Sequence, residues 1–102
     1  MIEKITDYEN KGGESLRNLV NEESVIINHV IIEPGQSFPA HVTEHEVHII
    51  IIKGEISISL GNQDAHEYKA GKMISLPNGV VSGISNPSKN TAELFVVKSI
   101  VR

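Results

Sequence analysis

Residues 47–62 read Val-His-Ile-Ile-Ile-Ile-Lys-Gly-Glu-Ile-Ser-Ile-Ser-Leu-Gly-Asn, and this stretch decides the fold class. Val47 to Lys53 is apolar at both odd and even positions, which predicts a strand that is buried on both faces. Gly54 allows a sharp reversal of the chain. From Glu55 to Leu60, Ile or Leu alternates with Glu or Ser, as in a strand with one face on a core, and Gly61-Asn62 is typical of a hairpin turn. The stretch therefore predicts two consecutive strands and a third one after the turn.

The rest of the chain carries the same kind of signal. We expect further strands at Ile2 to Tyr8 (an edge strand), Ser24 to Glu33, Ala65 to Ala70, Met73 to Leu76, Val80 to Ser85 and Ala92 to Val101. Ser15 to Asn21 fits either a short strand or a turn of helix. Many short strands separated by Gly, Pro and Asn turns predict an all-β sandwich or barrel. We expect a single domain over residues 1–102, with 1–23 as an N-terminal strand and loop extension and 24–101 as the barrel core.

The composition excludes several classes of function. The 102 residues carry a net charge of −4 with only two arginines, which argues against a nucleic-acid partner. There is no cysteine, so disulfides, thiolate nucleophiles and zinc–sulfur sites are excluded, and the cytoplasm is the expected location. The longest apolar run, Ile49 to Ile52, is far too short to span a membrane.

Two segments share a characteristic spacing of Gly, His, Pro and Asn. The first starts at Gly35 and ends at Gly54, with His41, Thr43 and Val47 between them. The second contains, in order, Gly71, Pro77, Gly79, Ser82 and Asn86. In this spacing, residues 24–100 resemble the cupin superfamily. The resemblance implies a double-stranded β-helix, also called a jelly-roll barrel, with a pocket inside it.

The resemblance implies the fold of the family, but it does not imply the metal chemistry of the family. Metal-bearing cupins bind their ion through three His and one Glu, and of these four positions only His41 keeps a ligand here. Thr43 and Ser82 replace two of the His, and Val47 replaces the Glu. A transition metal usually needs three or more N or O ligands from the protein, and hydroxyl groups are poor neutral ligands. We therefore expect no cofactor, or only weak metal binding.

A denser cluster of histidines leaves one alternative open. His41, His45 and His48 lie within eight residues and are a natural ligand set for Zn, Ni, Mn or Fe. In an extended strand that begins at Val47, however, His48 turns away from the interior unless a bulge redirects it. His45 then belongs to a solvated turn. We expect His29 to be a histidine whose hydrogen bonds are satisfied within the protein, and His66 to be exposed.

The family frame names the residues that line the pocket. These are His41, Thr43, Val47, Ile49, Ile51, Ser82 and Phe95. Such a lining suits a small, mostly apolar ligand held by a few polar contacts. Two alternatives stay open: a metal-dependent isomerase or oxygenase that uses His41, His45 and His48, and a structural protein whose barrel is packed solid. No residue is assigned a catalytic role, and Ser82 lacks the surroundings of a hydrolase nucleophile.

The strand Val47 to Ile52 also predicts an assembly. Its isoleucines on both faces would leave an apolar surface exposed in a single copy of the chain. We therefore expect a homodimer and no membrane partner.

Overall fold

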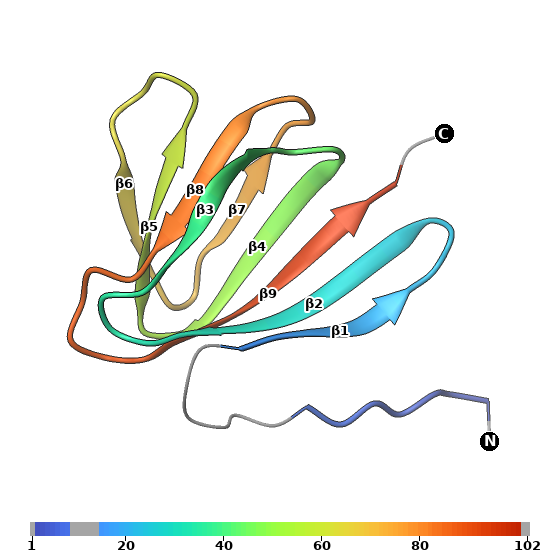
Figure 1. Ribbon diagram of the computed structural model, residues 1–102. Coiled ribbons are helices and arrows are strands. Elements are labelled where there is room, and N and C mark those ends of the chain that lie inside the picture. The colour runs from blue at the N-terminus through green and yellow to red at the C-terminus, as the bar shows by residue number, and fades with distance from the viewer. Residues whose placement is uncertain (1, 9–14, 101–102) are drawn as a thin grey trace.

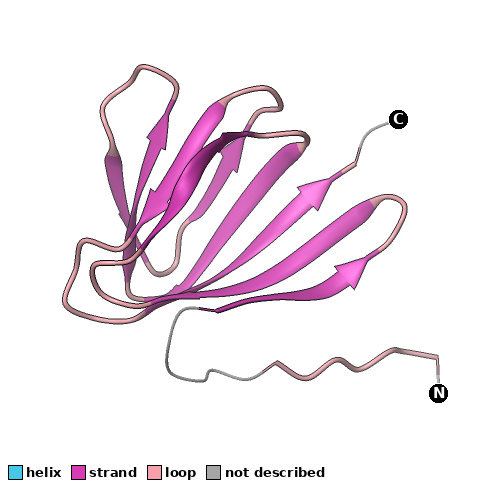
Figure 2. Cartoon of the chain, in the orientation of Figure 1, coloured by secondary structure: helices cyan, strands magenta, loops and turns pink. Residues whose placement is uncertain are grey.

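The computed structural model describes residues 2–8 and 15–100. Within these residues the chain forms strands and no helix (Figure 2). The strands are β1 (Ser15–Asn21), β2 (Val25–Ile32), β3 (Ser37–Val42), β4 (Glu46–Lys53), β5 (Glu55–Leu60), β6 (His66–Lys69), β7 (Met73–Leu76), β8 (Val81–Ser85) and β9 (Ala92–Ser99). None of the described residues forms a helix that could cross a membrane.

The strands form two antiparallel sheets that face each other (Figure 1). The five-stranded sheet has the order β1-β2-β9-β4-β7, and the four-stranded sheet has the order β3-β8-β5-β6. Strands β4 and β5 are joined by a tight turn, yet they lie in different sheets. The chain therefore passes from one sheet to the other at Gly54 and builds the two-layered barrel of a double-stranded β-helix.

The core fills the space between the two sheets with aliphatic side chains. Its buried members are Val30, Ile32, Val47, Ile49, Ile51, Ile56, Ile58, Leu76, Ala92 and Leu94. On β4 and β5 these residues stand at every second position, as the pleat of a strand requires. Burial of such side chains is the main favourable contribution to the stability of the fold.

Gly54 is required at the corner between the sheets for two reasons. Its φ of 77° lies in the left-handed region, which side chains other than Gly rarely adopt. A Cβ atom at this position would also lie 2.6 Å from the carbonyl oxygen of Thr91. The backbone before β9 can therefore approach β4 and β5 closely only because residue 54 has no side chain.

Several of the expected strands are confirmed. The strand predicted at Glu55 to Leu60 has the same bounds as β5, and the one at Met73 to Leu76 has the same bounds as β7. Ser15 to Asn21, which fitted a strand or a helical turn, is strand β1 and pairs with β2. Part of the N-terminal extension thus contributes a strand to the larger sheet. Of the strand predicted at Ala92 to Val101, Ala92–Ser99 is β9, and Val101 lies outside the described residues.

Two expectations about strands are wrong, and one strand was not predicted. Residues 2–8 form no strand, and their apolar side chains recur every third residue (Ile2, Ile5 and Tyr8), a period that does not fit a pleat. Strand β3 was not predicted; it contains Pro39, which is tolerated because β3 is an edge strand with an irregular register. Strand β4 is not buried on both faces, since Ile50 and Ile52 point outward.

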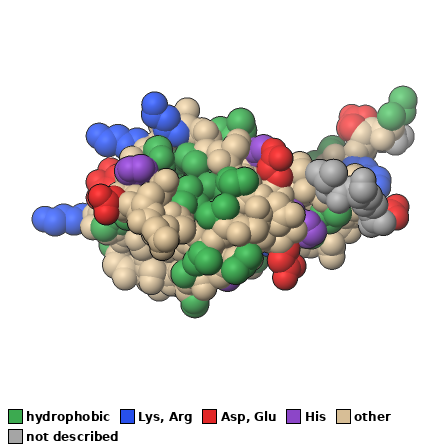
Figure 3. Space-filling model, turned by 90° about the horizontal axis from the view of Figure 1, so that it is seen from above, with side chains coloured by type: hydrophobic (Ala, Val, Ile, Leu, Met, Phe, Trp, Pro, Cys, Tyr) green, Lys and Arg blue, Asp and Glu red, His purple; other side chains and the backbone are tan. Residues whose placement is uncertain are grey.

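The outward face of β4 belongs to an apolar surface near the β7 edge of the five-stranded sheet. Ile50 is 38% exposed, Ile52 is 44% exposed, and Met73, the register partner of Ile50, is 62% exposed. Hydrophobic side chains also gather at the centre of the surface that is seen from above in Figure 3, with charged side chains toward its margins. Exposed apolar surface of this kind is a common feature of association sites.

Candidate functional site

A cavity of about 230 Å³ lies between the two sheets. Most of its wall is aliphatic or aromatic and comes from both sheets: Leu16, Val30, Phe38, Pro39, Val47, Ile49, Leu76, Ile84, Leu94 and Val96. The polar members are Asn28, His41, Thr43, Ser82 and Lys98. The side chains of the barrel therefore leave part of its interior open.

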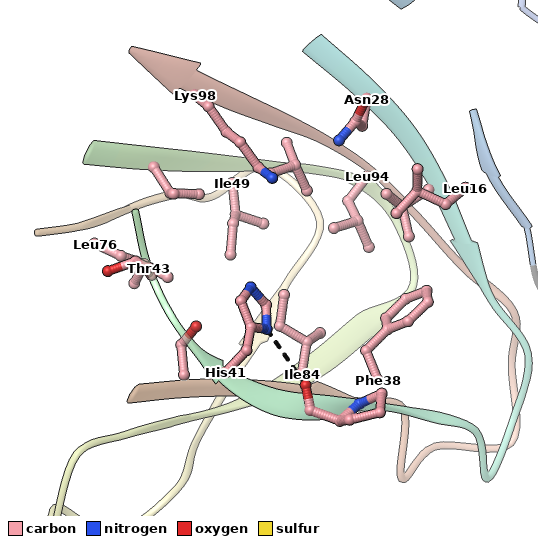
Figure 4. Close-up of a pocket in the computed structure, with 15 residues that line it drawn as sticks. Leu16, Asn28, Phe38, His41, Thr43, Ile49, Leu76, Ile84, Leu94 and Lys98 are labelled. Carbon is pink, nitrogen blue, oxygen red and sulfur yellow. Dashed lines mark hydrogen bonds between the residues drawn. The ribbon is translucent and has the colours of Figure 1, made fainter. Parts of the chain in front are cut away.

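Two polar residues enter the cavity from the five-stranded sheet, and two enter from the four-stranded sheet. Lys98 on β9 and Asn28 on β2 extend from one wall, opposite His41 on β3 (Figure 4). Lys98 is in register with Ile26, so Asn28 is its diagonal neighbour on the same face of the sheet. His41 is in register with Ser82 on β8. The cavity thus has a polar pair on each of two facing walls.

His41 is held weakly and faces the cavity. Its Nδ1 lies 3.4 Å from the carbonyl oxygen of Pro39, and because a carbonyl only accepts, Nδ1 carries the proton in this contact. In the neutral form of the ring, the other nitrogen, Nε2, is then an acceptor. His41 also lines a second hollow outside the cavity, which it shares with Glu44, His45 and Lys98. His41 and Lys98 therefore stand where the cavity meets the surface.

Thr43 lies at a metal-ligand position of the family pattern, but its side chain stabilises the backbone. Its hydroxyl donates to the carbonyl oxygen of Pro77 at 2.7 Å and accepts from the backbone N–H of Val80 at 3.1 Å. The backbone of Thr43 makes two further bonds to the same turn, at Gly79 and Val80. This side chain fastens the end of β3 to the 77–80 turn, and its hydroxyl is already engaged in that contact.

The predicted pocket residues divide into three groups. The cavity is lined by His41, Thr43, Val47, Ile49 and Ser82. Ile51 points inward as well but lies in the packed core rather than on the cavity wall. The placement of Phe95 in the pocket is wrong, because β9 directs Leu94, Val96 and Lys98 inward and Phe95 outward. The wall residues Asn28 and Lys98 were not predicted, since a polar residue in a strand is normally assigned to the solvent face.

Phe95 belongs instead to a cluster on the outer face of the five-stranded sheet. His29 is its register partner and is only 1% exposed, and Tyr8 packs on both rings at centroid distances of 4.8 and 4.9 Å. The imidazole Nε2 of His29 lies 2.8 Å from Oε2 of Glu93, which is also buried. His29 is therefore a satisfied histidine, and the ring of Tyr8 covers this part of the sheet.

His41, His45 and His48 do not converge. His48 follows Val47 on β4 and lies on the outer face, where Nδ1 is 2.8 Å from Ser75 Oγ and Nε2 is 3.3 Å from Glu46 Oε1. His45 lies in the bend before β4 and borders only the outer hollow. Over residues 2–8 and 15–100 there is no group of three or more His, Cys, Asp or Glu side chains that could hold a metal ion. The side chains at the family's metal positions therefore do not fit a metal ion, because only His41 among them is a good ligand.

The chain passes back and forth between two facing antiparallel sheets, which is the architecture of a double-stranded β-helix protein. The sequence model of the cupin domain family matches residues 28–98 of this chain. The chain therefore belongs to the cupin family.

The similar proteins agree on the fold. The uncharacterized protein MJ0764 of Methanocaldococcus jannaschii is 38% identical over 100 residues, which are 97% of this chain and 86% of that protein. Its crystal structure, described as an RmlC-like cupin family protein with a double-stranded β-helix fold, matches with a TM-score of 0.92 over 97% of this chain and 92% of that one. A cupin superfamily protein from Desulfitobacterium hafniense matches with a TM-score of 0.77 at 18% identity, over 95% of this chain and 84% of that one. The cupin domain of Schizosaccharomyces pombe Cnp3 matches with a TM-score of 0.80 at 20% identity, over 91% and 65%.

Proposed function

We propose that this cupin binds a small organic molecule in the cavity between its two sheets, without a resident metal ion. The single observation that supports this function is the cavity itself, with its mostly aliphatic wall and a few polar groups near its mouth. A cavity of roughly 150 Å³ with apolar walls is large enough for benzene. The volume of about 230 Å³ suits a ligand somewhat larger than that.

The binding test titrates isotope-labelled protein with neutral, anionic and cationic compounds of about the size of hexanoate and follows backbone amide shifts. We expect saturable shifts at residues around the cavity, such as Val30, Ile84 and Leu94. Val96→Phe places a larger side chain on the cavity wall and should abolish them. Val81→Phe makes the same change at an exposed position away from the cavity and should leave them intact. If no compound of any charge class produces cavity shifts in the parent protein, the proposed function is wrong.

The metal-dependent alternative has weaker support. It requires His41, His45 and His48 to act together, and β4 directs His48 to the other side of the sheet from His41. Elemental analysis of protein purified without added metal is the direct check. Stoichiometric Zn, Ni, Mn or Fe that survives dialysis and is lost in His41→Ala would contradict the metal-free proposal. We assign no catalytic residue, and the cytoplasm remains the proposed location.

We propose further that the protein is a homodimer, with a second copy of the chain on the apolar surface formed by Ile50, Ile52 and Met73. These three side chains are exposed on adjacent positions of β4 and β7. Burial of exposed apolar side chains against a second copy favours association, and a two-fold dimer would bury the same face of both copies. Light scattering at micromolar concentration should give twice the mass of the chain. Ile50→Lys should give a monomer of unchanged secondary structure, and a monomeric parent protein would contradict the proposal.

A further inference from the structure

The cavity has a chemical preference that follows from its polar groups, and this inference rests on the proposed function. We infer that the ligand is a small carboxylate with an aliphatic body, whose negative head lies between Lys98 and Asn28 and whose body lies among the aliphatic side chains deeper in the barrel. The inference depends on which hydrogen-bonding groups face the cavity, which charges line it, and how much room it offers.

The five-stranded sheet offers hydrogen-bond donors to the cavity. The ammonium group of Lys98 has three donors and no acceptor. Asn28 contributes its amide nitrogen, because its Oδ1 already accepts a bond of 3.0 Å from Asn18 Nδ2. In Figure 4 the side chains of Lys98 and Asn28 both extend over the cavity from neighbouring strands. A group that accepts from both donors at once is the natural occupant of this position.

The cavity wall has a positive charge without a negative one. Lys98 lines it, and no Asp or Glu does. Within the described part of the chain, the ammonium group makes no ion pair or side-chain hydrogen bond. Glu44 borders the adjoining hollow on the outside, which Lys98 also lines, so the outer rim is less positive than the interior. Lys98 is half-buried at the mouth of the cavity, and a bound carboxylate would pair with its charge on the side that faces the aliphatic wall.

The number and kind of cations favour a carboxylate over a phosphate. Proteins that bind phosphate dianions usually gather several donors, often with an arginine or the N-terminus of a helix. This cavity has one lysine and one amide on the same wall, and neither an arginine nor a described helix contributes to it. One cation matches a single negative charge. The aliphatic wall then selects a body that is apolar.

The wall formed by the four-stranded sheet adds polar groups to the site but no negative charge that would repel a carboxylate. The Ser82 hydroxyl can donate or accept, and Nε2 of His41 accepts while Nδ1 faces Pro39. This pair offers hydrogen-bond partners to a hydroxyl or keto group elsewhere on the ligand. The hydroxyl of Thr43 contributes nothing to this wall, since it already contacts the 77–80 turn.

The test compares two probes of equal size and different charge. Isothermal titration with sodium hexanoate and with hexanamide measures the preference of the parent protein for the negative head. We expect hexanoate to bind at least about tenfold more tightly, as hydrogen bonds to charged groups contribute that much or more. In Lys98→Met we expect the preference to disappear while hexanamide still binds, which also shows that the cavity is intact. Lys69→Met removes a lysine from β6, away from the cavity, and should leave both affinities unchanged.

The outcomes separate this inference from the proposed function. Equal affinity of the parent protein for both probes would overturn the carboxylate assignment and leave small-molecule binding intact. A loss of both probes in Lys98→Met would also overturn it, because the lysine would then shape the cavity instead of recognising charge. If neither probe binds the parent protein, and no compound of the wider panel does, the proposed function fails as well.

Discussion

The two faces of the five-stranded sheet differ in whether their polar side chains have partners within the protein. On the outer face, the imidazole of His29 is buried and paired with Glu93 at 2.8 Å. On the inner face, Lys98 is directed into an aliphatic cavity and makes no such pair with a described residue. Both positions come from adjacent strands of one sheet. Under the proposed function, the difference separates a polar group that stabilises the fold from one that binds the ligand, and mutations can test this separation.

The largest expected effect is at the outer pair. Glu93→Leu removes the partner of a histidine that is almost fully buried, and a buried polar group left without its partner destabilises a protein substantially. We expect the free energy of unfolding to fall by about 2–3 kcal/mol. Urea denaturation at a fixed protein concentration measures it. A change below the error of the measurement would show that the pair is not structural.

A smaller loss is expected at Thr43, whose hydroxyl joins β3 to the 77–80 turn. Thr43→Val keeps the shape of the side chain and removes the bonds to Pro77 and Val80. The unfolding free energy should fall by about 1–2 kcal/mol. Hexanoate affinity should change little, because the hydroxyl is already engaged in the turn. A variant that keeps its stability but loses binding would transfer Thr43 from the structural group to the ligand site.

For Lys98→Met we expect the free energy of unfolding to change in the opposite direction, so that the protein becomes more stable. The substitution replaces an ammonium group in an apolar surrounding by a side chain of similar length that packs well there. We expect the unfolding free energy to rise by up to about 1 kcal/mol, as is common where a binding group is removed. The same denaturation experiment measures the rise. A clear loss of stability would mean that Lys98 supports the fold, which would remove the contrast between the two faces.

The smallest effect is expected at Ser82, which stands at the other hydroxyl position of the family pattern. The hydroxyl of Ser82 lines the cavity, and the described residues offer it no side-chain hydrogen bond. Ser82→Ala should change the unfolding free energy by less than about 0.5 kcal/mol. Thermal denaturation beside Thr43→Val makes the comparison direct. Equal losses in the two variants would show that both hydroxyls are structural.

The sequence predicts the scaffold well where local signals agree. The clean alternation of Glu55 to Leu60 gives β5 without error, and the spacing from Gly71 to Asn86 indicates the family. Strand β3 was not predicted, and it contains Pro39, a residue that a sheet tolerates only at an edge or a bulge. A local pattern cannot report which strand becomes an edge.

The site was harder to predict than the scaffold because its key residue contradicts the rule of apolar residues inside. In Glu93-Leu-Phe-Val-Val-Lys98 both parities contain apolar residues, so alternation allows two orientations. The family frame places Phe95 inside, which leaves Lys98 in solvent, and the structure has the other orientation. Sites that bind ligands are where such rules are expected to fail. Similarly, the isoleucines of β4 predicted burial on two faces, but a single copy of the chain buries only one.

Pro39 has a consequence for how copies of this protein meet. It lies on β3, at the open border of the four-stranded sheet, and has no N–H to offer to an incoming strand. The irregular register between Phe38 and His41 further disturbs the row of backbone groups there. Together these features protect the border against endless strand-by-strand stacking, the first step toward fibrils. The same short segment that holds His41 at the mouth of the barrel is thus a poor template for an added strand.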